Sequence, residues 1–244
     1  MTDESKIVSR IRAALVTEPR IGVKSHPIGL SWSEGTLTMA GEVESVAAKK
    51  LALERAAAVV GVETIVDRLR VAPAKPMEDG AIRNALRDAF FQEPAFAECA
   101  LRALAKGATE VIRDVPGVTR GSIEYEIGDG IVTLNGELPS LEHKRLAGVL
   151  AWWIPGSRDV VNGIAVEPPE DDSDAQITDA VRHALEKDPF VDASQVRVLT
   201  RDSVVVLEGL VRSEGERDLA ESDAWYVFGV SGVVNSLAAS APTA

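Results

Sequence analysis

A segment of eleven residues occurs three times in the chain, and this internal repeat constrains the fold more than any other feature. The copies read GTLTMAGEVES from residue 35, GIVTLNGELPS from residue 130 and SVVVLEGLVRS from residue 203. Each copy of such a repeat is one structural unit. We therefore predict three similar domains at residues 1–72, 77–167 and 172–240, called repeats 1, 2 and 3 below.

The composition, 45% apolar and 26% charged residues, is typical of a globular protein. No apolar run reaches the ~18 residues that a membrane-spanning helix needs. The polar segment from Met1 to Lys6 lacks the pattern of a secretory signal, so we expect a cytoplasmic protein. One cysteine, Cys99, excludes an internal disulfide framework.

The net charge of −12 is unevenly distributed along the chain. Residues 1–74 carry 10 basic and 9 acidic side chains, residues 75–167 carry 10 and 14, and residues 168–244 carry 6 and 15. Binding to nucleic acid depends on neutralising phosphates, so this acidic chain is not expected to bind it. Attraction to anionic lipid is weakened for the same reason, least for repeat 1.

Each repeat begins with a predicted helix, because apolar residues recur at i, i+4 and i+8. These residues are Ile7, Ile11 and Leu15; Ile82, Leu86 and Phe90; and Ile177, Val181 and Leu185. Each helix runs into an acidic residue followed by proline, at Glu18, Glu93 and Asp188. Proline disfavours helix at the residue before it, so the helices are predicted to stop there.

A hairpin follows: strict alternation of apolar and polar residues indicates its first strand, and a tight turn leads to the second strand. The inward residues of its second strand should be Leu37 and Met39, Val132 and Leu134, and Val205 and Leu207. Gly41, Gly136 and Gly209 are predicted to mark a bend or a close approach of the backbone.

A second helix should start at Ser45, Ser140 and Ser213, since serine is a favoured N-cap. It is predicted to end at Gly61, Gly156 and Gly229, and a third strand closes each repeat. The order helix, strand, strand, helix, strand predicts an α+β fold. Three tandem αββαβ domains should each have two layers, with helices on one face of a small mixed three-stranded sheet.

Repeat 2 contains an insertion, at about residues 95–121, that the other repeats lack. The spacing of its apolar residues predicts an additional helix over residues 96–113. An insertion in one repeat of an array often lies on the working face, and the alternative is a helix that only covers a sheet edge.

The order of elements and the motifs G-x-V-x-L-x-G and G-V-x-x-V-x-N-x-L resemble the BON domain. The matching segments are 130–136 with 156–164, 204–209 with 232–237, and 35–41 with 61–67, where Asp67 replaces the asparagine. The resemblance implies a non-enzymatic bacterial binding module linked to the envelope, osmotic stress and phospholipid contact. The better-known members are periplasmic, whereas a smaller cytoplasmic member binds potassium. We therefore predict a binding or scaffold protein or, alternatively, a cytoplasmic sensor of a small ligand or a potassium-type cation.

No set of residues predicts catalysis, a cofactor or a metal site. His26, His143 and His183 fall at different positions of their repeats, and no phosphate-binding glycine motif occurs. Cys99 is predicted to be a buried, inert thiol.

Aromatic residues gather at the end of the second helix in repeats 2 and 3. Trp153 and Tyr226 follow an apolar line of the helix and are predicted to be core, whereas Trp152 and Trp225 follow a polar line. Such a tryptophan packs against a neighbouring repeat, contacts a protein partner or inserts into a membrane surface. Trp152, Trp225 and Phe228 are the predicted contact residues. The oligomeric state does not follow from the sequence.

Overall fold

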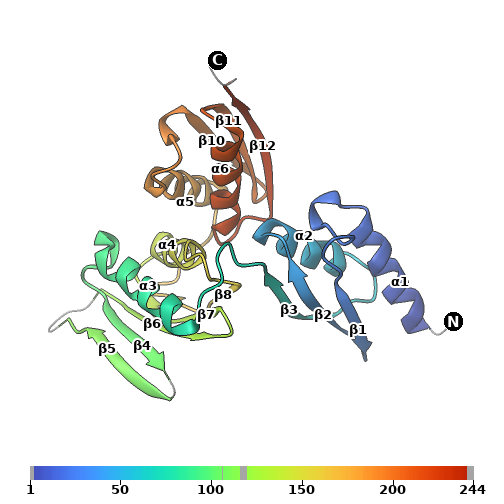
Figure 1. The fold of residues 1–244 in the computed structure, drawn as a ribbon, viewed down its shortest axis with the longest axis horizontal. Coiled ribbons are helices and arrows are strands. Elements are labelled where there is room, and N and C mark those ends of the chain that lie inside the picture. Colours follow the sequence, from blue (N-terminus) through green and yellow to red (C-terminus); the bar gives the residue numbers. More distant parts are fainter. Residues whose placement is uncertain (1–2, 106, 116–119, 241–244) are drawn as a thin grey trace. The chain divides into compact units, whose positions relative to one another are not determined.

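The computed structural model describes residues 3–105, 107–115 and 120–240 (Figure 1). The chain forms two compact units, Met1–Ala72 and Pro73–Ala244, and the second of these contains repeats 2 and 3. Six α-helices and three separate sheets lie in the described residues, which confirms the α+β class.

Repeat 1 has the predicted order of elements. These are α1 (Asp3–Val16), the 3-10 turn η1 (Pro19–Ile21), β1 (Gly29–Ser33), β2 (Thr36–Val43), α2 (Val46–Ala57) and β3 (Thr64–Val71). Strand β2 pairs antiparallel with β1 and parallel with β3, so the sheet is mixed. Leu37 and Met39 are fully buried, as the alternation predicts.

Repeat 3 has the same topology. Its elements are α5 (Asp174–Lys187), η3 (Ala193–Gln195), β10 (Val196–Arg201), β11 (Val204–Val211), α6 (Glu214–Tyr226) and β12 (Gly232–Ala239). The central strand β11 pairs antiparallel with β10 and parallel with β12. Val205 and Leu207 are fully buried beneath the helices.

The insertion in repeat 2 is a β-hairpin, so the predicted helix over residues 96–113 is wrong. Repeat 2 consists of α3 (Asp79–Gln92), η2 (Pro94–Phe96), β4 (Ala100–Ala105), β5 (Ala108–Arg113), β6 (Ser122–Gly128), β7 (Ile131–Leu138), α4 (Leu141–Trp152), β8 (Asp159–Asn162) and β9 (Ala165–Val166). Strand β4 pairs with β6, which extends the sheet to the order β5-β4-β6-β7-β8, with β9 also on β7. Burial of alternate residues, Cys99, Leu101 and Ala103, in the core outweighs the helix-like spacing.

The serine caps are confirmed in all three repeats. Ser45, Ser140 and Ser213 accept hydrogen bonds from the backbone N–H three residues later. The helices end earlier than predicted, at Ala57, Trp152 and Tyr226, because two or three residues of turn precede each glycine. Among the sheet glycines, Gly209 has φ +133°, and a Cβ there would lie 2.0 Å from the carbonyl oxygen of Gln195.

The third strand of each repeat is anchored to the second helix by one side chain. Asn162 and Asn235 donate to the carbonyl oxygens of Lys144 and Arg217 in α4 and α6. Asp67 has no amide to donate, and Lys49 of α2 pairs with its carboxylate at 2.9 Å instead. Repeat 1, which has Asp67 where the other repeats have asparagine, therefore uses a buried lysine to bind this side chain.

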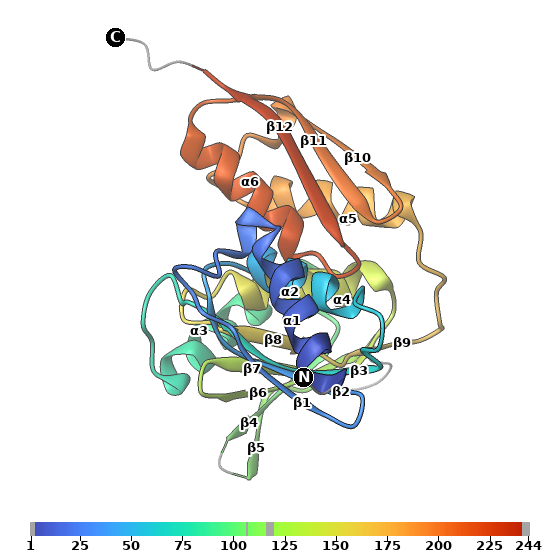
Figure 2. The ribbon, with the colours of Figure 1, turned by 90° about the vertical axis from the view of Figure 1, so that its right-hand side faces the viewer.

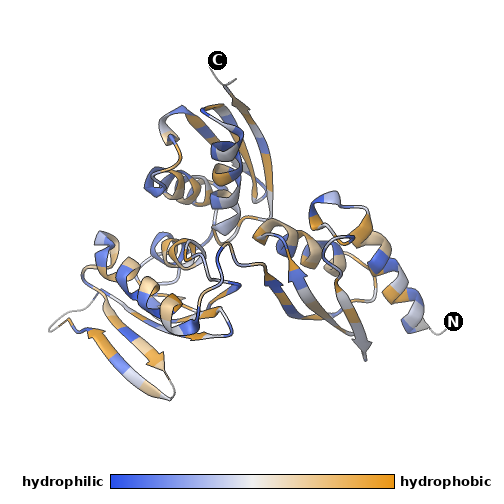
Figure 3. Ribbon diagram, viewed as in Figure 1, coloured by the Kyte–Doolittle hydropathy of each residue, from blue (hydrophilic) through white to orange (hydrophobic). Residues whose placement is uncertain are grey.

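In repeat 3, helices cover one face of the sheet formed by β10, β11 and β12 and leave its other face uncovered (Figure 2). Its strands carry hydrophobic as well as hydrophilic residues (Figure 3), and β11 begins with the apolar run Val204 to Leu207. Val198, Val205 and Val233 are buried beneath α5 and α6. Because successive side chains of a strand point to opposite faces, the residues next to these valines point to the uncovered face.

Candidate binding surfaces and the junction of repeats 2 and 3

The aromatic residues at the ends of α4 and α6 meet where repeats 2 and 3 pack together. The ring of Trp152 stacks on Tyr226 with centroids 5.9 Å apart and an interplanar angle of 12°. The indole N–H of Trp153 donates to Asp223 Oδ1 at 2.8 Å. Trp225 is 1% exposed, whereas Phe228 is 49% exposed and lies below the ammonium group of Lys144, 5.2 Å from its ring centroid. The structure thus brings Trp152 and Tyr226 together across the junction, while Trp225 is buried.

Arg145 is the largest polar side chain buried at this junction, with 1% exposure. Its Nε donates to the carbonyl oxygen of Phe228 at 2.9 Å, and its Nη2 donates to Asp172 Oδ1 at 2.5 Å. A buried guanidinium is tolerated only when it is paired and hydrogen-bonded, and both conditions are met here. Sequence reasoning placed Arg145 on a polar line of α4 but missed that it binds the next repeat.

The acidic residue before each proline has the same local role in all repeats. Glu18, Glu93 and Asp188 each accept a hydrogen bond from the backbone N–H two residues later. All three side chains are about nine-tenths buried. A buried carboxylate needs a compensating partner, and that partner differs among the repeats.

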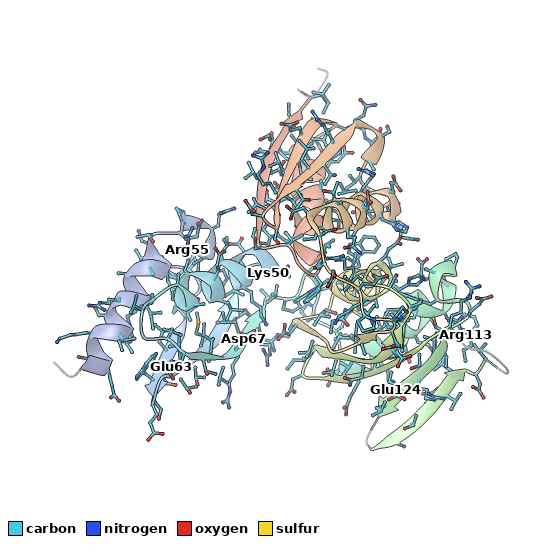
Figure 4. The ribbon with its side chains drawn as sticks, turned by 180° about the vertical axis from the view of Figure 1, so that it is seen from behind. Lys50, Arg55, Glu63, Asp67, Arg113 and Glu124 are labelled. Atoms are coloured by element: carbon cyan, nitrogen blue, oxygen red, sulfur yellow. The ribbon has the colours of Figure 1, made fainter. Side chains whose placement is uncertain are left out.

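In repeat 1 the partner is a cation of the same repeat. Arg55 projects from α2 (Figure 4) and lies 3.1 Å from Glu18 Oε2, while Arg20 contacts Oε1 at 2.9 Å. The hydrogen bond from the Arg20 side chain, aided by Arg55 and opposed by burial, lowers the pKa of Glu18 to about 2.

In repeat 2 the cation comes from the next repeat. Lys187 of α5 donates to both carboxylate oxygens of Glu93 at 3.0 Å. The residue of α4 that corresponds to Arg55 is Leu150, which cannot supply a charge. This ion pair is therefore a further polar contact across the junction.

In repeat 3 the corresponding residue is acidic. Asp223 of α6 occupies the position of Arg55 and is 2% exposed, next to Asp188, which is 8% exposed. Burial raises the pKa of Asp223 to about 8; the charge of Asp188 and its hydrogen bond with Asp223 add to this, while the bond from Trp153 opposes it. The charge reversal from Arg55 to Asp223 is visible in the aligned sequence, but the contact with Trp153 is not.

The inserted hairpin is held to repeat 2 by Arg113 (Figure 4). Its guanidinium donates to the backbone carbonyl oxygens of Cys99, Phe91 and Phe96, and it lies 5.3 Å above the centroid of the Phe91 ring. Beside it, Arg102 pairs with Glu124 at 3.5 Å across neighbouring strands. Strand β5 is consequently a fixed edge strand whose first four residues, 108–111, are exposed.

The uncovered face of the sheet in repeat 3 carries an apolar row across its three strands. Leu199 pairs with Val206, and Val206 pairs with Val234. Leu199 is 41% exposed and Val234 is 50% exposed. The corresponding rows are Ser31, Thr38 and Val66 in repeat 1, and Glu126, Thr133 and Val161 in repeat 2.

Two arginines flank this row on the edge strand β10. Arg197 and Arg201 lie two residues before and after Leu199, so all three side chains point to the same face. Arg197 lies 3.6 Å from Glu208, which belongs to the neighbouring row. We call Arg197, Leu199, Arg201, Val206 and Val234 the repeat 3 face.

The residues that sequence reasoning considered for chemistry lie apart. His143 contacts the Ser140 hydroxyl at 2.7 Å, and His183 contacts Glu142 at 2.9 Å across the junction. Cys99 is buried, and burial raises the pKa of its thiol. In the part of the chain that the structure describes, no group of three His, Cys, Asp or Glu side chains is placed to share a metal ion, and no helix is long and apolar enough to cross a membrane.

Comparison with known sequences defines the class of protein. The sequence model of the BON domain matches residues 3–73, 102–168 and 173–241, so the chain belongs to the BON domain family. The match to repeat 2 starts within β4 and does not include α3.

Two similar proteins were also found. The chain is 28% identical over 162 residues to the osmotically-inducible protein Y of Escherichia coli K12, a match that covers 66% of this chain and 72% of that protein. Among solved structures, it is similar to the C-terminal domain of CdsD, a structural protein of the type III secretion system of Chlamydia trachomatis. That similarity covers 99% of both chains at 15% identity, with a TM-score of 0.24.

Proposed function

We propose that this BON-domain protein is a non-enzymatic binding or scaffold protein of a stress response, and that it contacts phospholipid through the repeat 3 face. The similarity to an osmotically inducible BON-domain protein supports the stress-related binding role. The cytoplasmic location stays a prediction from the sequence.

The observation that carries this proposal is the exposed apolar row between two arginines. Leu199 and Val234 lie on strands that are fixed by the sheet, so they are exposed by the architecture and not by a mobile loop. Aliphatic side chains gain free energy when they leave water for the acyl boundary of a membrane. Arg197 and Arg201 on the same strand provide donors for lipid phosphate groups.

The charge of the rest of repeat 3 sets the conditions for binding. Residues 168–244 carry 15 acidic against 6 basic side chains, which repel anionic lipid. Binding by the repeat 3 face should therefore depend on burial of the apolar row and on the local arginines, and the overall repulsion should decrease as salt screens it.

The aromatic residues that the sequence predicted as contacts are not the main lipid contacts in this proposal. Trp152 stacks on Tyr226 at the junction and Trp225 is buried, so neither is a lipid contact in this proposal. Phe228, with about half its surface exposed, is available as an additional contact.

The test is co-sedimentation of the full chain with vesicles of phosphatidylcholine and phosphatidylglycerol. We expect Val234→Asp to lose at least ~5-fold in bound fraction, because a carboxylate replaces a side chain buried in the acyl boundary. Val161→Asp is the matched control, because Val161 holds the corresponding position in repeat 2, in the row that also contains Glu126. Equal binding of both variants would refute the proposed face. Absence of vesicle binding, together with a potassium-dependent rise in melting temperature, would favour the cation sensor instead.

A further inference from the structure

The junction of repeats 2 and 3 contains a carboxyl pair that lacks the cation found at the corresponding position of repeat 1. Asp223 Oδ1 accepts from the indole of Trp153 and Asp188 Oδ1 accepts from the N–H of Phe190. Asp223 Oδ2 is buried and meets no N–H donor among the described residues. Two carboxyl groups that face each other can satisfy this oxygen only if one of them holds a proton.

We propose that Asp188, Asp223 and Trp153 form a pH-dependent latch, which holds repeats 2 and 3 together while the two carboxyl groups share one proton and loosens when that proton passes to solvent. The latch is independent of the proposed lipid contact, because it lies at the junction and not on the repeat 3 face.

The direction of the effect follows from the burial of Asp223. In the closed junction its pKa is raised to about 8, by burial first and by Asp188 second. When α4 separates from α6, water reaches Asp223 and its pKa falls towards the ordinary value for aspartate. Opening therefore releases a proton, so a rise in pH shifts the equilibrium towards the open junction.

The other groups around the pair do not reverse this direction. From α4 the pair meets the neutral indole of Trp153. From α5 the nearest cation is Lys187, whose ammonium group is bound by Glu93. On α6, burial raises the pKa of Tyr226 to about 12, so the phenol stays neutral. Within the described residues, neither carboxyl of the pair has an ion pair with a cation.

The experiment is a titration of the full chain from about pH 4 to about pH 9, followed by tryptophan fluorescence and by the radius of gyration from small-angle scattering. We expect a fluorescence transition whose midpoint lies below about pH 8, between the pKa values of Asp223 in the open and in the closed junction, and a concurrent increase in the radius of gyration. Asp223→Asn should remove the transition, because an amide accepts from Trp153 and donates to Asp188 without titrating. Asp218→Asn, a change of an exposed aspartate on the same helix, should leave the midpoint unchanged.

Two further measurements keep the test decisive. Asp188→Asn removes the neighbouring charge but leaves Asp223 buried, so the transition should persist and move to lower pH. This second variant keeps the test decisive if Asp223→Asn misfolds, which circular dichroism would show. The latch is refuted if the wild type shows no transition in this range, if folded Asp223→Asn retains it, or if Asp188→Asn leaves the midpoint unchanged. A midpoint that moves by more than ~1 pH unit on addition of potassium or calcium chloride would show that a cation neutralises the pair, which also overturns the proposal.

Discussion

The indole N–H of Trp153 lies 2.8 Å from Asp223 Oδ1, and this hydrogen bond joins the C-cap of α4 in repeat 2 to the last turn of α6 in repeat 3. Together with the stack of Trp152 on Tyr226, it shows that aromatic residues at a helix end join two copies of the same fold. The junction is therefore part of the architecture that presents the uncovered sheet face.

Replacing Trp153 tests this bond directly. Trp153→Phe keeps most of the apolar surface but removes the donor, and we expect a loss of ~1–2 kcal/mol in the free energy of unfolding. Because the bond to Trp153 lowers the pKa of Asp223, its removal should also move the fluorescence midpoint to higher pH. Urea denaturation and the pH titration measure the two effects. Trp32→Phe, a change in repeat 1, is the control and should leave that midpoint in place.

Arg145 should be the most sensitive single position of the junction. Arg145→Ala leaves the carbonyl oxygen of Phe228 without its donor and Asp172 without its cation, and we expect destabilisation by ~3 kcal/mol. Arg182→Ala removes an exposed arginine from the neighbouring helix and should cost less than ~0.5 kcal/mol. Chemical denaturation of the second unit compares them, and equal costs would contradict a structural role for Arg145.

In repeat 1, Lys49 and Asp67 should behave as a coupled pair. Lys49→Met leaves the partly exposed carboxylate of Asp67 without its cation and should cost ~2 kcal/mol. Adding Asp67→Asn restores the amide that repeats 2 and 3 use at this position, so the double variant should recover at least half of the loss. A double-mutant cycle on the free energy of unfolding provides the measurement. Additive losses would mean that the two residues do not interact.

Glu18 should make the stability of repeat 1 sensitive to acid. Its pKa is lowered from 4.5 to about 2, mainly by the side chain of Arg20, so its contribution is complete above pH 4.5 and disappears as the pH falls through about 2. We expect Glu18→Gln to be destabilised relative to wild type at neutral pH and to approach it at low pH. Thermal melts of residues 1–72 across this range test the sign. A difference that grows on acidification would contradict it.

Local sequence patterns predicted most of the fold because each pattern reports a local property. The spacing of Ile82, Leu86 and Phe90 reflects one buried helix face, and the alternation around Val132 and Leu134 reflects a half-buried strand. The hairpin of residues 100–113 was missed because Leu101 and Leu104 suit a helix. These residues form strands because β4 pairs with β6, and this pairing is a tertiary contact that the local sequence does not show.

The junction and the surfaces were less predictable for the same physical reason. Trp152 and Trp225 were both placed on a polar line, yet one stacks on the neighbouring repeat and the other is buried. Which of these occurs depends on the packing of two repeats, and a single helix does not encode it. The repeat 3 face is, in contrast, readable in hindsight: Leu199 and Val206 stand where the other repeats have Ser31 and Thr38, or Glu126 and Thr133.

The most direct measurement of the proposed lipid contact uses these corresponding positions as reporters. Leu199→Cys, Glu126→Cys and Ser31→Cys are each labelled with an environment-sensitive dye, since the native Cys99 is buried. On addition of phosphatidylglycerol-containing vesicles, the account predicts a blue shift of the emission at position 199 and little change at positions 126 and 31. No shift at position 199, or equal shifts at all three positions, would contradict it.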